Sequence, residues 1–256
     1  MRGSEAKGDT AILVLGGTGE ANDLMRALRE RWPRRRLILS LAGRTTAPVV
    51  PDAVEIRSGG FGGAAGLAAF LAAERIGLLL DATHPFAAGI ARNAAKAADQ
   101  ANIARLKLLR PPWQPGPGDR WVEVSCLGDA CDALPPGARP FLALGRQHLQ
   151  PFTRRLDLLP LARMIEPPEP PLPDSWTLRL ARPAPDAASE AQLMRTHGIT
   201  HLVTRNAGGS ASYAKVEAAR TLALPVIMIA RPPAPDGPVV ATVDAMVEAV
   251  AGGSVG

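Results

Sequence analysis

Short, mainly apolar segments alternate with segments of helical periodicity along almost the whole chain. Residues 11–15 form a continuous apolar run, and further strands are expected at residues 37–42, 76–81 and 104–108. Runs without polar alternation are typical of strands that are buried on both faces. Between residues 20 and 31, apolar side chains recur with the spacing of a single helix face. This alternation predicts an α/β fold that is built on mostly parallel sheets.

The other expected elements continue the same pattern. A strand is expected at residues 53–57, and the glycine cluster at residues 59–63 opens a helix that runs to about residue 73. A further helix is expected at residues 85–100. The second half repeats the alternation, with strands at 121–125, 140–144, 158–164, 176–181, 201–204 and 225–230 and helices at 128–134, from Gln147, at 186–197, 211–222 and 242–251.

A segment rich in proline and glycine, residues 110–118, interrupts the alternation and predicts a connection between two domains. We therefore expect residues 1–112 to form one Rossmann-like domain and residues 113–256 to form a second, with an active-site cleft between them. The length of 256 residues also allows a single large α/β domain. The pattern leaves open whether the two halves exchange strands.

Several classes of protein are disfavoured by composition. No apolar run approaches the roughly 18–20 residues that span a bilayer, and no apolar signal core precedes the first strand, so we expect a cytoplasmic protein. Cys126 and Cys131 are the only cysteines, which argues against a disulfide framework. His197 and His201 are separated by the helix breaker Gly198, and we expect no metal site.

The chain is basic, with a net charge of +5. A basic balance suits nucleic acid, an anionic membrane or an anionic small molecule as a partner. The arginines are spread along the chain without a basic block beyond Arg34-Arg35-Arg36, and no RNA-binding motif of aromatic and basic residues is present. We therefore favour an acidic small molecule over nucleic acid or membrane. The arginine usage of a high-GC genome is the alternative explanation.

A glycine-rich loop lies between the first strand and the first helix. Glycine permits unusual backbone angles there and lets a pyrophosphate approach closely, while the N-terminus of the helix receives the anion. The loop reads GGTGEA and not GxGxxG, so a purely structural turn is the alternative. The contacts that we expect from it to a dinucleotide are Gly16, Gly17, Thr18, Gly19 and Glu20.

The end of the second strand distinguishes between the two nicotinamide cofactors. NAD sites usually place an acidic residue there to bind the ribose 2′-hydroxyl, but residues 40–46 contain none. Arg44 instead offers a planar donor fork that matches a 2′-phosphate, and a solvated loop arginine is the alternative. We therefore predict NADPH as the cofactor, with contacts from Ser40, Gly43, Arg44 and Thr45.

The segment Asp81-Ala82-Thr83-His84-Pro85-Phe86-Ala87 follows the strand at residues 76–81. Together with the glycine cluster and the GGTGEA loop, it resembles the precorrin-6A reductase family, which includes the cobalt-precorrin-6A reductases. Ala207 departs from the family, because relatives often carry serine there. The likeness extends from about residue 11 to residue 233 and includes Arg110-Pro111-Pro112-Trp113, Ala143-Leu144-Gly145-Arg146-Gln147, Arg205-Asn206-Ala207-Gly208-Gly209, Ala214-Lys215 and Pro225-Val226-Ile227-Met228-Ile229.

The resemblance implies two Rossmann-like domains with NADPH in the first. It also implies hydride transfer to precorrin-6A, an anionic tetrapyrrole, giving precorrin-6B in cobalamin (vitamin B12) biosynthesis. The alternatives are the cobalt-precorrin-6A reductase of the anaerobic route and a non-catalytic protein that binds or senses NADP. Transient contact with neighbouring enzymes of the pathway is the expected protein partnership. Further expected cofactor contacts are Gly60, Phe61, Ala82 and Thr83.

The remaining predicted site residues also follow strands. His84 is expected to line the nicotinamide pocket or to donate a hydrogen bond, and a histidine fixed by Pro85 at a helix start is the alternative. In the second half, cationic and polar side chains are expected to bind substrate carboxylates, with capping or surface ion pairs as the alternative. These substrate-binding residues are Arg146, Gln147, Arg205, Asn206, Ser210 and Lys215.

Overall fold

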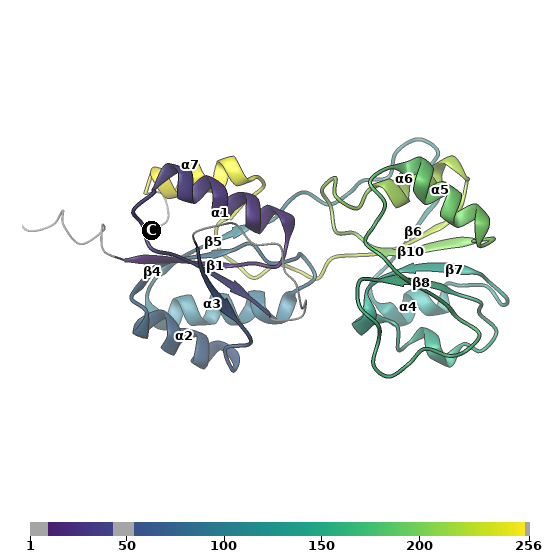
Figure 1. Ribbon diagram of the computed structural model, residues 1–256, viewed down its shortest axis with the longest axis horizontal. Coiled ribbons are helices and arrows are strands. Elements are labelled where there is room, and N and C mark those ends of the chain that lie inside the picture. The colour runs from purple at the N-terminus through teal and green to yellow at the C-terminus, as the bar shows by residue number, and fades with distance from the viewer. Residues whose placement is uncertain (1–9, 43–53, 254–256) are drawn as a thin grey trace, which may run out of the picture. The chain divides into compact units, whose positions relative to one another are not determined.

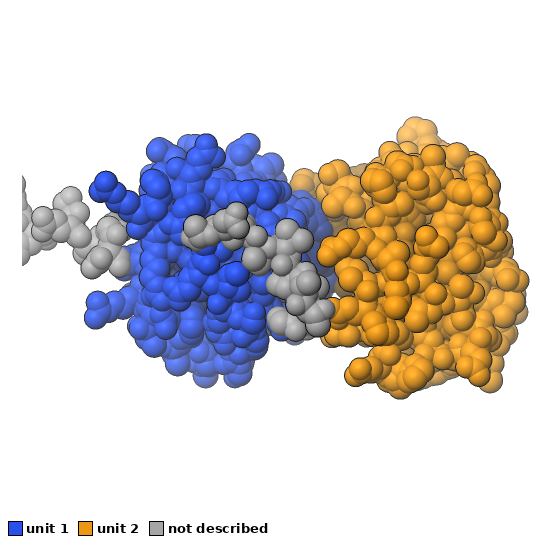
Figure 2. All heavy atoms as spheres, viewed as in Figure 1, with its two compact units in different colours: residues 1–110, 232–256 blue, residues 111–231 orange. Residues whose placement is uncertain are grey.

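The computed structural model describes residues 10–42 and 54–253, and its ribbon is shown in Figure 1. The chain divides into two compact units, residues 1–110 together with 232–256 and residues 111–231 (Figure 2). Each unit contains its own six-stranded sheet. Every strand pairing in the described part of the chain is parallel. The predicted fold class of two Rossmann-like domains is confirmed, and the cleft between them stays a prediction.

In the first unit the strand order is β12-β5-β4-β1-β2-β3. Helices α1 and α7 cover one face of this sheet, and α2 and α3 cover the other (Figure 1). The element bounds are β1 Ala11–Leu15, α1 Gly19–Arg31, β2 Leu37–Leu41, β3 Glu55–Ser58, α2 Gly63–Ala73, β4 Ile76–Asp81, α3 Ala88–Ala101, β5 Ala104–Leu108, β12 Val239–Val240 and α7 Val243–Ala251.

The apolar pattern of β1 explains its central position between β4 and β2. All five of its residues are buried, so the strand needs helices on both faces. On one face, Leu24 and Leu28 of α1 pack into the same core cluster as Ile12 and Val14. The other face is covered by α2 and by the alanine-rich α3, whose small side chains allow close packing against the sheet.

The end of the chain corrects the predicted domain boundary. The sequence pattern predicts that residues 232–256 belong to the second domain, but they belong to the first unit. There β12 pairs with β5 through Val240 and Leu108, and Met246 of α7 is fully buried in the core beneath α1. The amphipathic pattern of α7 predicts a buried face without indicating which sheet that face covers, and a two-residue strand leaves no readable pattern. The first crossing between units, at Arg110, lies within the predicted connection.

The second unit has the strand order β6-β11-β10-β7-β8-β9. A helix predicted from Gln147 is wrong, because two short 3-10 turns occupy this stretch, Arg146–His148 and Phe152–Arg154. Pro151 explains the difference, since a proline cannot donate the backbone hydrogen bond that a helix interior needs. The element bounds are β6 Trp121–Val124, α4 Leu127–Asp132, β7 Pro140–Ala143, β8 Leu161–Met164, β9 Thr177–Leu180, α5 Ala187–Thr196, β10 His201–Arg205, α6 Ala214–Thr221 and β11 Val226–Ile229.

Among the described residues, no helix is both long enough and apolar enough to cross a bilayer.

Candidate functional site

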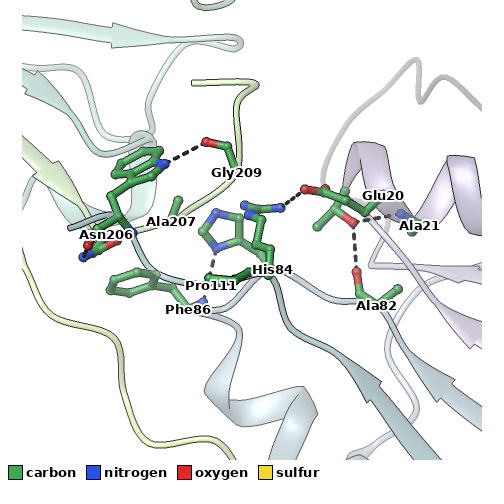
Figure 3. Close-up of polar contacts among 12 residues, drawn as sticks. Glu20, Ala21, Ala82, His84, Phe86, Pro111, Asn206, Ala207 and Gly209 are labelled. Carbon is green, nitrogen blue, oxygen red and sulfur yellow. Dashed lines mark hydrogen bonds and ion pairs between the residues drawn. The ribbon is translucent and has the colours of Figure 1, made fainter. Parts of the chain in front are cut away.

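The loop between β1 and α1 is fixed by the side chain of Thr18. Its Oγ1 accepts a hydrogen bond from the backbone N–H of Ala21, at 3.1 Å, and so caps α1. The same hydroxyl donates to the backbone oxygen of Ala82, at 2.9 Å (Figure 3). Thr18 therefore joins the glycine loop to the segment that follows β4, at the carboxyl edge of the sheet where ligands of α/β proteins bind.

The glycines of this loop are needed for different structural reasons. A Cβ atom at Gly16 would lie 2.6 Å from the side chain of Leu39, so a larger residue there would force this buried side chain to shift. Gly17 has a φ of +105°, which L side chains rarely adopt. A Cβ at Gly17 or Gly19 would meet no described atom within 4 Å. The space over these two glycines is therefore open on the protein side, as a phosphate-binding turn requires.

Asp81 organises the polar end of β4. Its Oδ1 accepts hydrogen bonds from the backbone N–H and the hydroxyl of Thr83, at 3.1 and 2.6 Å. Its Oδ2 lies 2.8 Å from Nζ of Lys107 on β5, and both side chains are almost fully buried. This buried ion pair fixes the start of the DATHPFA segment. The sequence contained one signal for it, an aspartate that ends an otherwise apolar strand.

A small hollow of about 40 Å³ lies beside this network in the first unit. It brings together four of the predicted cofactor contacts, Thr18, Glu20, Ala82 and Thr83. Residues that the sequence did not assign to a site complete the lining: Pro85, Leu108, Arg110, Ala241, Thr242 and Val243. The returning C-terminal segment thus supplies part of the wall.

Arg110 is the charged residue of the hollow that sequence reasoning missed. Its Nη1 lies 2.5 Å from Oε1 of Glu20, in the first turn of α1. The two residues are 90 positions apart in the chain, so no local pattern connects them. The one sequence signal for Arg110 is its place in the motif Arg110-Pro111-Pro112-Trp113, which resembles the family.

His84 takes part in a local turn. Its Nδ1 accepts a hydrogen bond from the backbone N–H of Phe86, at 3.2 Å (Figure 3). Helix α3 begins at Ala88, later than predicted, and the turn at Pro85 and Phe86 precedes it. Pro85 lines the hollow. The role of His84 toward a nicotinamide ring stays a prediction.

The remaining predicted cofactor contacts lie on other segments. Gly60 and Phe61 belong to a loop that Arg57 holds, because its guanidinium donates to the backbone oxygens of Gly59 and Gly60 at 2.6 and 2.8 Å and lies 3.7 Å from the centre of the Phe61 ring. Ser40 is buried on β2, and its backbone oxygen accepts from the N–H of Gly16. Gly43, Arg44 and Thr45 lie outside the described residues.

In the second unit the structure brings two predicted segments together. Nη1 of Arg205, at the end of β10, lies 3.0 Å from Nε2 of His148, in the turn that also contains Arg146 and Gln147. Burial lowers the pKa of Arg205 to about 10. Arg146 is more exposed and pairs with Glu166 at 3.3 Å.

The other predicted substrate contacts differ in exposure. Ser210 is exposed, whereas Lys215 on α6 is buried, with Nζ 2.5 Å from the backbone oxygen of Ser212. The carboxamide of Asn206 bonds to the backbone of Trp113 through both its oxygen and its nitrogen, at 2.8 and 2.9 Å. Asn206 therefore fixes the connecting segment, and its predicted contact with the substrate stays a prediction.

Two parallel-sheet units, the first with a glycine loop and a hollow at its carboxyl edge, define a two-domain protein of the Rossmann-like class. The chain matches the family described as precorrin-6x reductase CbiJ/CobK over residues 11–251. It belongs to this family of cobalamin-biosynthetic oxidoreductases, and the resemblance stated from its motifs is confirmed.

Individual relatives match nearly the whole chain. A precorrin-6A reductase from Rhodococcus erythropolis is 47% identical over 243 residues, which cover 94% of this chain and 96% of the relative. A precorrin-6A reductase from Rhodobacter capsulatus is 43% identical, covering 92% and 93%. A solved structure, CobK precorrin-6A reductase, superposes with a TM-score of 0.87 at 42% identity and covers 95% of this chain and 96% of its own.

Proposed function

We propose that this protein reduces precorrin-6A to precorrin-6B with NADPH as the hydride donor, in the cytoplasm. Membership of the precorrin-6x reductase family supports the reaction. The observation that carries the proposal is the hollow at the carboxyl edge of the first sheet, which joins the glycine loop to the segment after β4.

The residues of the first unit fit a nicotinamide dinucleotide. Space for a pyrophosphate is open over Gly17 and Gly19, and the N-terminus of α1 favours a negative group there. In this proposal Thr18 and Thr83 hold the part of the cofactor that enters the hollow. The 2′-phosphate is assigned to Arg44 on the sequence argument alone.

The cofactor, when bound, supplies the hydride, and the chain supplies orientation and charge. The ion pair of Asp81 with Lys107 keeps Thr83 in place at the hollow. In the second unit, Arg205 and Arg146 are assigned to the carboxylates of the tetrapyrrole. Carboxylates that leave water need cationic donors, and a guanidinium provides paired charge-assisted hydrogen bonds. The other proposed substrate contacts are Gln147, Asn206, Ser210 and Lys215.

The direct test mixes purified protein with precorrin-6A and NADPH and follows the loss of cofactor absorbance and the mass of the product. We expect NADPH to be consumed only when the tetrapyrrole is present, and the product to gain a hydride and a proton. Cobalt-precorrin-6A in a parallel reaction distinguishes the anaerobic-route alternative. Binding of NADPH without consumption in either reaction would support the non-catalytic alternative.

Cofactor choice is tested at Arg44. Arg44→Ala should weaken NADPH binding by about 1.5–3 kcal/mol, the range for hydrogen bonds to charged groups, because the 2′-phosphate loses its guanidinium partner. NADH lacks that phosphate, so its affinity should change little. Calorimetric titration of both cofactors into the wild type and the variant measures the difference, and equal losses for the two cofactors contradict the assignment.

A further inference from the structure

The chain passes between the two units at two places, after Arg110 and after Arg231. These crossings lie side by side on the first-unit side. The backbone N–H groups of Lys107 and Leu109 donate to the oxygens of Pro238 and Val240, at 3.1 and 2.8 Å. The strand that leads to the first crossing is therefore paired with the strand that follows the second.

Within the first unit, the first crossing is fastened to the proposed cofactor site. Arg110 forms its ion pair with Glu20, and both side chains line the hollow. Glu20 follows the glycine loop directly, in the first turn of α1. A change in the position of this turn therefore acts on Arg110, the last residue before the crossing.

Within the second unit, both crossings are fastened to the loop that follows Arg205. The guanidinium of Arg231 donates through Nε to the backbone oxygen of Asn206, at 2.7 Å. Its Nη2 donates to the oxygens of Ala207 and Pro111, at 2.8 and 3.1 Å. Arg231 thus ties the residue after the first crossing to the loop at residues 206–209.

Packing and further hydrogen bonds hold the loop at residues 206–209 against the segment at residues 111–113. Gly208 has a φ of +66°, and a Cβ atom there would clash with the backbone oxygen of Pro111. Nε1 of Trp113 donates to the oxygen of Gly209, at 2.7 Å (Figure 3). With the two bonds from Asn206 to the backbone of Trp113, these contacts attach the loop to the segment at residues 111–113.

We propose that Arg110 and Arg231 are positioning residues that couple cofactor binding to the substrate-binding loop through the crossing Arg110-Pro111. The inference rests on the proposed function, because it takes NADPH and precorrin-6A as the two ligands. Pro111 and Pro112 restrict the backbone of the crossing, so a displacement at Arg110 is passed on and not absorbed. Coupling of this kind is reciprocal, since each ligand changes the affinity for the other by the same factor.

The test measures the dissociation constant of precorrin-6A with and without saturating NADP⁺, which carries no hydride and allows no turnover. In the wild type, NADP⁺ should tighten precorrin-6A binding by a factor in the range of about 5 to 150. Arg110→Gln and Arg231→Ala should bring this factor close to one. This holds even where a variant also changes the affinity for NADP⁺ or for precorrin-6A measured without the other ligand. The matched control is Arg155→Ala, which removes another arginine that binds backbone oxygens of the second unit, those of Cys131 and Leu134.

The inference is supported if NADP⁺ no longer tightens precorrin-6A binding in either variant but still does so in the control. It is overturned if NADP⁺ has no effect on precorrin-6A binding in the wild type. It is also overturned if the effect of NADP⁺ is unchanged in both variants, or if Arg155→Ala loses it equally. The proposed function is judged separately, by whether the wild type binds each ligand alone and consumes NADPH. If Arg231→Ala fails to fold, Arg110→Gln decides the outcome from the other unit.

Discussion

Lys215 is a buried amine whose protonation is linked to folding. Burial lowers its pKa from the ordinary 10.5 to about 7, with Arg163 and Arg205 acting in the same direction and Glu190 opposing them. Between these two values the unfolded chain binds a proton that the folded chain does not, so the free energy of unfolding should rise with pH across this window. Below about pH 7 the amine is protonated in both states, and burying its charge lowers the free energy of unfolding by its full amount, on the order of several kcal/mol.

Lys215→Met should therefore flatten the pH dependence of stability between about pH 7 and about pH 10. Denaturant unfolding of the wild type and the variant at several pH values measures the two slopes. The variant should gain most relative to the wild type at neutral pH, because the lost amine no longer imposes its desolvation cost. Parallel pH profiles for the two proteins would show that the amine titrates as it does in water.

Substitutions of single residues also test whether Arg205 and Arg146 bind the carboxylates of precorrin-6A. Arg205→Ala and Arg146→Ala should each raise KM for precorrin-6A or lower turnover by roughly tenfold or more, the effect of one charged hydrogen bond. NADPH affinity should stay near the wild-type value, because the cofactor is assigned to the other unit. Arg195→Ala, an exposed arginine on α5, is the matched control. Normal kinetics in both site variants would remove the case for a carboxylate site there.

At the scale of elements, the sequence predicted those parts whose cause is local. β1 and β4 were predicted to the residue, because burial on both faces leaves a mainly apolar run. The glycine loop was predicted for a similar reason, since its backbone requirement is local to a few residues. The ion pair of Asp81 with Lys107 was missed because its partners are 26 positions apart and meet only through strand pairing.

The glycine loop gives the prediction at this scale. Gly19→Ala should leave the melting temperature within a few degrees of the wild type, because its Cβ meets no described atom, yet it should weaken NADPH binding by occupying the open space. Gly16→Ala should instead destabilise the fold by about 1–3 kcal/mol, the cost of overpacking against Leu39. Thermal melts and NADPH titrations of both variants separate the two roles. Unchanged NADPH affinity in a folded Gly19→Ala protein would make the loop a structural turn only.

At the scale of the whole molecule, the chain forms its first unit from both of its ends. No pattern in residues 232–256 indicates which sheet they join, because amphipathic helices look alike whichever core they cover. The structure shows which sheet they join, because β12 pairs with β5 and α7 is buried in the core of the first unit. Folding of the first unit therefore depends on residues that follow the whole second unit in the sequence, whereas the second unit is continuous in sequence.

Met246 provides the test of this arrangement. Met246→Ala removes a fully buried side chain and should cost about 2–5 kcal/mol through lost burial and the cavity left behind. Amide hydrogen exchange should then report faster opening of β1 and β5, while β7 and β10 keep their protection, because α7 packs in the core of the first sheet alone. Phe141→Leu, in the core of the second unit, is the mirror control and should loosen β7 and β10 instead. Faster exchange of β7 and β10 in Met246→Ala would place residues 232–256 with the second unit, as the sequence alone had predicted.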